Sequence, residues 1–190
     1  MTARRWAALA GPAVLGGLLG ALGGWLWWVW WGPATQGRVY ETKAGKAWYP
    51  DPFDPGITRD FSGTATYVVV GFALALLLGL VGGWFARQHA LAGVVAVVVG
   101  AGLGALAMTL VGEWLSPPDP ASLLSSHAVG DRLPGSLAVA GWTPYLAWPV
   151  GALLGYLVLM VSLPVPPAGE DASAGSEQSA PRSGAPAPQG

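Results

Sequence analysis

The chain has 190 residues, of which 53% are hydrophobic and only 10% are charged, against about 25% charged residues in a typical soluble domain. The formal net charge is −1, so there is no basic excess and we expect no nucleic-acid partner. Cysteine is absent, which excludes disulfides, thiolate catalysis and cysteine-ligated metals. This composition predicts an integral membrane protein.

Four stretches are long and apolar enough to be membrane-spanning helices. A bilayer core about 30 Å thick needs roughly 20 apolar residues in a helix, and lipid offers no partners to unpaired backbone groups, so each span must be helical. The predicted fold is therefore an all-α membrane domain over residues 1–163. Its spans are residues 6–31, 64–85, 91–115 and 142–163, and its long loops, 32–63 and 116–141, share one side.

Five tryptophans lie within residues 25–31, at the end of the first span. On a helix they surround the axis, whereas a ligand face or partner stripe would lie on one side. Such a distribution is typical of aromatic side chains at the level of the lipid headgroups, and the following Gly-Pro pair should end the helix. The predicted membrane-interface residues are Trp25, Trp27, Trp28, Trp30, Trp31, Trp114, Trp142 and Trp148.

Basic residues near the span ends predict the orientation. The long-loop side carries more of them, but Arg4 and Arg5 precede the first span, which is too long for a signal peptide and is expected to be an uncleaved anchor. Because the flank of the first span usually dominates, we expect a multi-pass protein of the cell membrane with both termini in the cytoplasm.

The first and third spans resemble each other. A shift of 84 positions aligns residues 16–33 with 100–117 without a gap, and matches Trp30 with Trp114 and Pro33 with Pro117. A weaker similarity links residues 77–79 with 153–155. Self-similarity indicates duplication, although Gly/Ala/Leu-rich helices also resemble one another by chance. We expect two tandem helical hairpins, related by a pseudo-two-fold axis along the membrane normal.

Small residues recur at every fourth position in all four spans. Lipid supplies no hydrophobic force between helices, so close backbone approach along such ridges provides the contact. The pattern predicts a compact bundle and leaves self-association open. The predicted helix-packing residues are Gly16, Gly20, Gly24, Gly79, Gly83, Gly100, Gly104, Gly151 and Gly155.

The segments outside the spans differ in character. Residues 38–49, RVYETKAGKAWY, are typical of a short β-hairpin with a glycine-containing turn. Residues 164–190 are rich in Pro, Ser and Gly and lack aromatic residues. That tail is predicted to be disordered, because it cannot bury enough apolar surface to offset its ordering entropy.

Few side chains within or beside the spans are of the types that carry ions, move protons or line a ligand site. The span interiors contain no Asp, Glu, Lys, Arg or His, which argues against a proton- or ion-coupled transporter. Glu113 is expected to lie among headgroups, or else to contact Arg132 or Arg59. Pro149 is expected to free the Tyr145 carbonyl and kink the last span, either as a structural bend or beside a lipid cleft.

The loops contain residue types found in catalytic and metal sites. Ser125, Ser126, His127 and Asp131 are the types of a hydrolase triad, but no nucleophile elbow accompanies them. The carboxylates of Asp51, Asp54 and Asp60 do not have the spacing of an EF-hand loop. We therefore predict no catalytic residue, no metal and no cofactor.

Several segments carry a family resemblance. A Gly-rich first span ending in WWGP, a short basic turn, a third span ending in EWLSPPDP and a last span containing YLAWPVGALLGY lie within residues 10–163. In these features the chain resembles an actinobacterial family of small four-span membrane proteins of unknown function. The resemblance implies the four-span fold and no activity.

These features favour a non-enzymatic membrane protein that is a structural or accessory component of a cell-envelope complex. Its expected partners are membrane lipids and either another membrane protein or a second copy of itself. A transporter or channel for a lipid or apolar solute is the alternative. A lipid-modifying enzyme that uses His127, Asp131 or Glu113 at the interface comes third.

Overall fold

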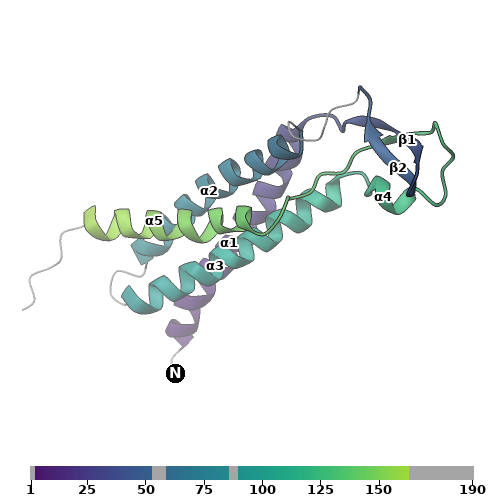
Figure 1. The fold of residues 1–190 in the computed structure, drawn as a ribbon. Coiled ribbons are helices and arrows are strands. Elements are labelled where there is room, and N and C mark those ends of the chain that lie inside the picture. Colours follow the sequence, from purple (N-terminus) through teal and green to yellow (C-terminus); the bar gives the residue numbers. More distant parts are fainter. Residues whose placement is uncertain (1–2, 53–58, 86–89, 163–190) are drawn as a thin grey trace, which may run out of the picture.

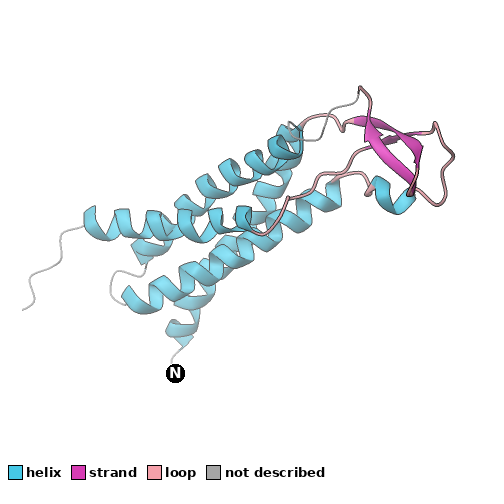
Figure 2. Ribbon diagram, in the orientation of Figure 1, coloured by secondary structure: helices cyan, strands magenta, loops and turns pink. Residues whose placement is uncertain are grey.

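The computed structural model describes residues 3–52, 59–85 and 90–162. It is a bundle of long helices with a small sheet beyond one end (Figures 1 and 2). Four helical segments are long and apolar enough to cross a membrane, as predicted: Ala10–Trp31, Ser62–Phe85, Ala90–Leu115 and Thr143–Ser162. The tail, residues 164–190, lies outside the described residues, so its predicted disorder stays a prediction.

The first three long helices begin and end close to the predicted bounds. They are α1 (Ala3–Trp31), α2 (Arg59–Phe85) and α3 (Ala90–Leu115). Helix α1 is followed by Gly32, whose φ of 79° is in the left-handed region that favours glycine after a helix end. The predicted stop at the Gly-Pro pair is therefore confirmed.

The last span has two parts. It begins as a 3₁₀ helix, η1 (Thr143–Leu146), and continues as α5 (Ala147–Ser162). Pro149 consequently lies in the first turn of α5, where a missing backbone N–H is tolerated. The sequence placed this proline more than one turn inside a continuous α-helix, and that placement is wrong because the α-helix starts only at Ala147.

The helices associate in two close pairs. The most extensive contacts join α1 to α3 and α2 to α5, while α2 also contacts α1 and α3, and α3 also contacts α5. Figure 1 shows α2 and α5 side by side along much of their length. Each close pair therefore takes one helix from the first half of the chain and one from the second.

A three-stranded sheet joins the two long loops. Strands β1 (Gln36–Thr42) and β2 (Gly45–Pro50) form the predicted antiparallel hairpin. Strand β3 (Arg132–Pro134), from the second long loop, pairs with the other edge of β1, so the order is β2-β1-β3. A short helix, α4 (Pro120–Leu123), is capped by the Asp119 carboxylate. We call the sheet, α4 and their connecting loops the sheet layer.

Candidate functional site

Aromatic side chains from α1, α2 and the last span lie together in the interior of the bundle. The ring of Trp27 on α1 contacts the ring of Tyr67 on α2 edge to face, with ring centroids 5.1 Å apart. Tyr67 contacts Tyr145 of η1 in the same manner at 5.6 Å. With Trp148 of α5, these side chains form what we call the aromatic cluster, and Trp27, Tyr67 and Trp148 are fully buried.

Hydrogen bonds across the cluster connect three helices. Trp27 Nε1 donates to the Gly63 carbonyl oxygen at 2.8 Å, which joins α1 to α2. Tyr67 Oη donates to the carbonyl oxygen of Ala105 on α3 at 3.2 Å, and Thr109 Oγ1 donates to the same oxygen at 3.0 Å. These donors need protein acceptors, because the interior of a membrane bundle holds little water to replace them.

Trp148 is the exception in the cluster. Its indole lies between Gly71 of α2 and Gly104 of α3, where a Cβ on either glycine would collide with the ring. Its Nε1 is buried and has no hydrogen-bond partner among the described residues. An unpaired buried donor costs about 1–3 kcal/mol, so the packing of this ring must offset that term.

The predicted interface tryptophans divide into two groups. Five are exposed on the outside of the bundle or at its sheet end, most of all Trp114 at 82%, while Trp31 is half-buried. The other exposed members are Trp25, Trp28, Trp30 and Trp142. The interface assignment stays a prediction for this group.

For Trp27 and Trp148 the predicted membrane-interface position is corrected. Both are fully buried in the bundle, so neither side chain reaches headgroups in this fold. A signal for this was present in the sequence. Trp27 follows Gly24 by three residues and continues the small-residue ridge of α1 that faces α3, and Trp148 precedes Gly151 on the ridge of α5 by the same spacing.

The predicted packing glycines lie where helices approach most closely, and all are buried. A Cβ on Gly16 would overlap the backbone of Gly100, and a Cβ on Gly20 would overlap that of Gly104. In the other pair, a Cβ on Gly79 would overlap the Ala152 carbonyl. Substituents larger than hydrogen at these positions would therefore force the helices apart.

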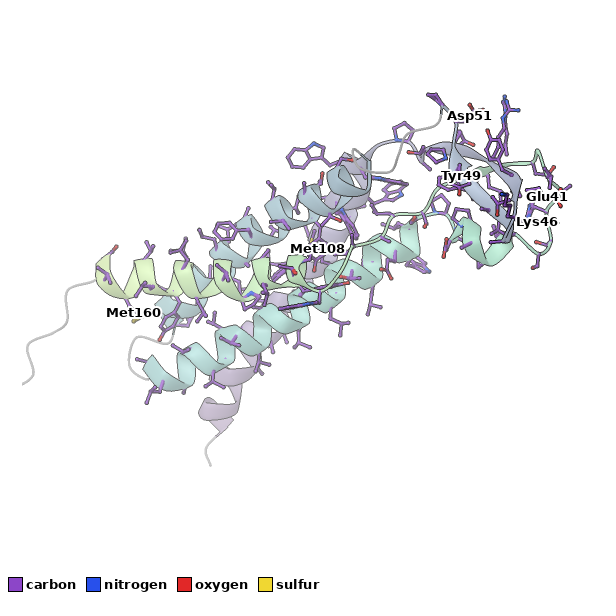
Figure 3. The ribbon with its side chains drawn as sticks, viewed as in Figure 1. Glu41, Lys46, Tyr49, Asp51, Met108 and Met160 are labelled. Carbon is purple, nitrogen blue, oxygen red and sulfur yellow. The ribbon has the colours of Figure 1, made fainter. Side chains whose placement is uncertain are left out.

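The remaining glycines of the set have comparable surroundings. Gly24 faces the backbone of α3 at Met108, while Gly151 and Gly155 face the carbonyl oxygens of Phe72 and Leu76 on α2. Gly83 differs, because its nearest neighbours are side-chain atoms of α5. Met108 itself is fully buried and is labelled within the bundle in Figure 3.

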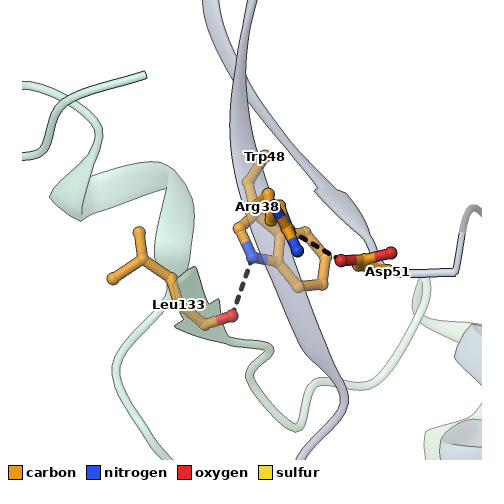
Figure 4. A network of polar contacts seen from close by, with 4 residues as sticks. All are labelled: Arg38, Trp48, Asp51 and Leu133. Atoms are coloured by element: carbon orange, nitrogen blue, oxygen red, sulfur yellow. Dashed lines mark hydrogen bonds and ion pairs between the residues drawn. The ribbon is translucent and has the colours of Figure 1, made fainter. Parts of the chain in front are cut away.

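Polar contacts hold the sheet layer together. Trp48 on β2 donates from Nε1 to the Leu133 carbonyl oxygen on β3 at 3.0 Å, and its ring covers Gly37 of β1. Arg38 Nε donates to Asp51 Oδ2 at 2.7 Å (Figure 4). Lys46 Nζ donates to the His127 carbonyl oxygen at 2.6 Å. The Lys46 contact joins the hairpin to the second long loop, whereas the Arg38–Asp51 contact reinforces the end of the β1–β2 ladder.

The triad-type residues of the second long loop form local contacts. His127 Nδ1 lies 2.9 Å from the Leu123 carbonyl oxygen and 3.2 Å from Ser126 Oγ. Asp131 Oδ2 accepts from the Ala128 backbone N–H at 2.9 Å. Because Asp131 binds the backbone and not His127, these contacts build the loop and do not align a proton relay.

Carboxylates elsewhere are dispersed. Glu113 is exposed and, in the part of the chain described, makes no ion pair with Arg132; the side chain of Arg59 is not described. Asp51 pairs with Arg38, Asp54 lies outside the described residues, and the side chain of Asp60 is likewise not described. Across residues 3–52, 59–85 and 90–162, no three His, Asp or Glu side chains gather as metal ligands would.

The chain was compared with family models, curated proteins and solved structures, and none of them matches it. The resemblance to the actinobacterial four-span family therefore stays a prediction that rests on its sequence pattern.

Proposed function

We propose that this protein is a non-enzymatic structural or accessory component of a cell-envelope membrane complex. In this proposal the bundle is the anchor and the sheet layer is the part presented to partners. The observation that carries the proposal is the pairing of β1 with β3, in which Gly37 lies opposite Leu133. This pairing turns two separate loops into one folded surface, and such a surface is suited to recognition.

The bundle supports an anchoring role. Its close pairs rest on glycine contacts with neighbouring backbone, and its span interiors contain no Asp, Glu, Lys, Arg or His. Intramembrane charges commonly mark ion and proton pathways. A tightly packed and uncharged interior is what a passive membrane anchor requires.

The test is recovery of a partner that depends on the layer. Protein tagged at its natural expression level would be cross-linked in cells and extracted in mild detergent. We expect a membrane protein to co-purify in stoichiometric amount with the wild type. Leu133→Asp, which places a charge at a buried position of β3, should lose that partner while the protein level is maintained.

The matched control is Ala121→Asp, an exposed position of α4, which should retain the partner. A wild-type protein that purifies alone after cross-linking would contradict the proposal. Equal retention of the partner by the Leu133→Asp variant and the wild type would also contradict the proposal.

We also propose that the chain is a duplicated hairpin in which corresponding helices pair. Gly16 faces Gly100 and Gly20 faces Gly104, each partner lying 84 positions later, the same shift that aligns the two spans in the sequence. In the second pair, Gly155 faces Leu76 and Leu80, which flank the aligned residue Gly79. Contacts between corresponding residues support a pseudo-two-fold relation within each pair.

The proposed orientation places the termini in the cytoplasm and the sheet layer outside. The natural absence of cysteine allows a direct test with single-cysteine variants. Ala44→Cys in the exposed hairpin turn should react with a membrane-impermeant maleimide in intact cells, whereas Gln88→Cys should react only after lysis. Ala44 is chosen over Gly45 because the φ of 115° at Gly45 strains any side chain. The opposite labelling pattern would reverse the orientation.

A second candidate function is transport or binding of a lipid or apolar solute. The unpaired Nε1 of buried Trp148 favours it, because a ligand oxygen could accept from this donor once η1 and α5 separate from α2. Native mass spectrometry of the purified protein should then show a retained lipid, and Trp148→Phe should release it. Loss of the lipid from the Trp27→Phe variant but not from the Trp148→Phe variant would argue against this assignment, since Trp27 already has a partner.

A further inference from the structure

The sheet has one buried and one exposed face. Val39 of β1 and Leu133 of β3 are buried on the same face, because side chains alternate along a strand. Their neighbours Arg38, Tyr40 and Arg132 therefore point to the opposite side, where Tyr40 and Arg132 are exposed and Arg38 is partly so. We call this side the outer sheet face.

A row of three side chains crosses the outer sheet face from strand to strand. Arg38 at its centre lies opposite Arg132 on β3 and opposite Tyr49 on β2. Adjacent strands are about 4.8 Å apart, so the two arginines start from neighbouring backbone positions. Like charges directly opposite each other destabilise a sheet, so this pair calls for compensating negative charge.

That compensation is incomplete. Asp51 pairs with Arg38 through a 2.7 Å contact between Oδ2 and Nε. The side chain of Arg132 makes no hydrogen bond or ion pair with any described residue. Lys46 on β2 does not belong to the row, because its side chain lies on the opposite face and donates to the His127 carbonyl oxygen. Within the part of the chain that the structure describes, the positive charge of Arg132 therefore has no compensating partner.

Two aromatic rings lie on the same face, one on β1 and one on β2. Tyr40 and Tyr49 are 43% and 38% exposed, and their ring centroids are 6.0 Å apart at an interplanar angle of 60°. Tyr49 and Asp51 are labelled on the sheet in Figure 3. The described residues of this face include no Leu, Ile, Val, Met or Phe. It therefore lacks the apolar anchor pocket typical of tight binding to a folded protein.

We propose that the outer sheet face binds an anionic glycan, with Arg132 holding its carboxylate or phosphate group and Tyr40 and Tyr49 contacting its sugar rings. A guanidinium group matches carboxylate and phosphate geometry through two parallel hydrogen bonds. The negative faces of aromatic rings attract the positively polarised C–H groups of a sugar. This inference deepens the proposed envelope role and rests on it, since it places the layer where envelope glycans occur.

Full-length protein in nanodiscs of zwitterionic lipid would be titrated with oligogalacturonate by isothermal calorimetry. We expect binding to oligogalacturonate and none to neutral maltooligosaccharide of the same length. Arg132→Gln should weaken binding about tenfold, the scale expected for losing a hydrogen bond to a charged group. Tyr40→Ser should weaken it by a similar factor, about tenfold, because it removes an aromatic contact with a sugar ring. Arg132→Lys should retain part of the affinity, because it keeps the charge but not the planar fork.

The control is Lys43→Gln, which removes an exposed cation in the hairpin turn and should leave the affinity unchanged. Equal weakening by Lys43→Gln, equal binding of oligoglutamate, or no binding of oligogalacturonate would each overturn the inference. A stoichiometric protein partner without glycan binding would overturn this inference alone, whereas glycan binding without such a partner would overturn only the proposed accessory role.

Discussion

In the bundle, Gly20 lies against the backbone of Gly104, whereas in the sheet layer Trp48 donates to Leu133 and Arg38 pairs with Asp51. The first kind of contact depends on shape, because lipid tails are as apolar as the helices and only close packing favours their association. The second kind depends on polar groups that water also solvates, so each such contact contributes less. Substitutions should therefore have larger effects in the bundle than in the layer.

The largest effect should follow Gly20→Ile. Its Cβ would overlap the Gly104 backbone, and the helices must separate to admit it, at a cost of at least about 2 kcal/mol. The free energy of unfolding in mixed micelles, followed by circular dichroism, measures this. Gly17→Ile is the matched control, because a Cβ at Gly17 meets nothing within 4 Å. Equal destabilisation by both variants would remove the distinction between packed and lipid-facing positions.

A smaller effect should separate the two buried tryptophans. Trp27→Phe and Trp148→Phe delete the same atoms from fully buried sites, but only Trp27 loses a hydrogen bond, the one to Gly63. Trp27→Phe should therefore be more destabilising by at least roughly 0.6–2 kcal/mol, the range for hydrogen bonds within membranes, because Trp148→Phe also removes an unpaired donor. The same micelle assay measures the difference, and a larger loss from Trp148→Phe would show that its indole N–H does have a partner.

Within the layer, Trp48→Phe should act locally. It removes the bond to the Leu133 carbonyl oxygen, worth about 1 kcal/mol, and so loosens β3 from the hairpin. Amide hydrogen exchange should become faster at residues 132–134 while the helices stay protected. Tyr40→Phe, on the exposed face, is the control and should leave exchange unchanged. Faster exchange throughout the bundle would show that the two regions are not independent.

The smallest effect should follow Asp51→Asn. The side chains of Asp51 and of its partner Arg38 are both 39% exposed. The ion pair therefore contributes about 0–1 kcal/mol and is screened by salt. The stability difference from wild type should shrink when NaCl is raised from low to near-molar concentration, as read from thermal unfolding of the layer. A difference that persists in high salt would indicate a role other than charge pairing for Asp51.

Some parts of this fold follow from local sequence patterns and can be predicted, whereas others depend on contacts between segments far apart in the chain. Span length and apolarity act locally and are enough to predict four helices, and the alternation around Gly45 is enough for the hairpin. Strand β3 has only three residues, Arg132–Pro134, and forms because β1 offers it an edge, which no local pattern reveals. The burial of Trp27 likewise depends on α3 as its neighbour. The small-residue ridge from Gly16 to Gly24, which Trp27 continues, was a local signal for this burial.

The pairing of β1 with β3 has a mechanical consequence. Strand β1 lies between α1 and α2 in the chain, and β3 lies between α3 and α5, so one ladder ties the linker between α1 and α2 to the linker between α3 and α5. A pull on either linker is consequently shared by all four helices. A protease that nicks one linker beyond the ladder would leave two fragments that still migrate as one particle in mild detergent, until a denaturing detergent separates the helices.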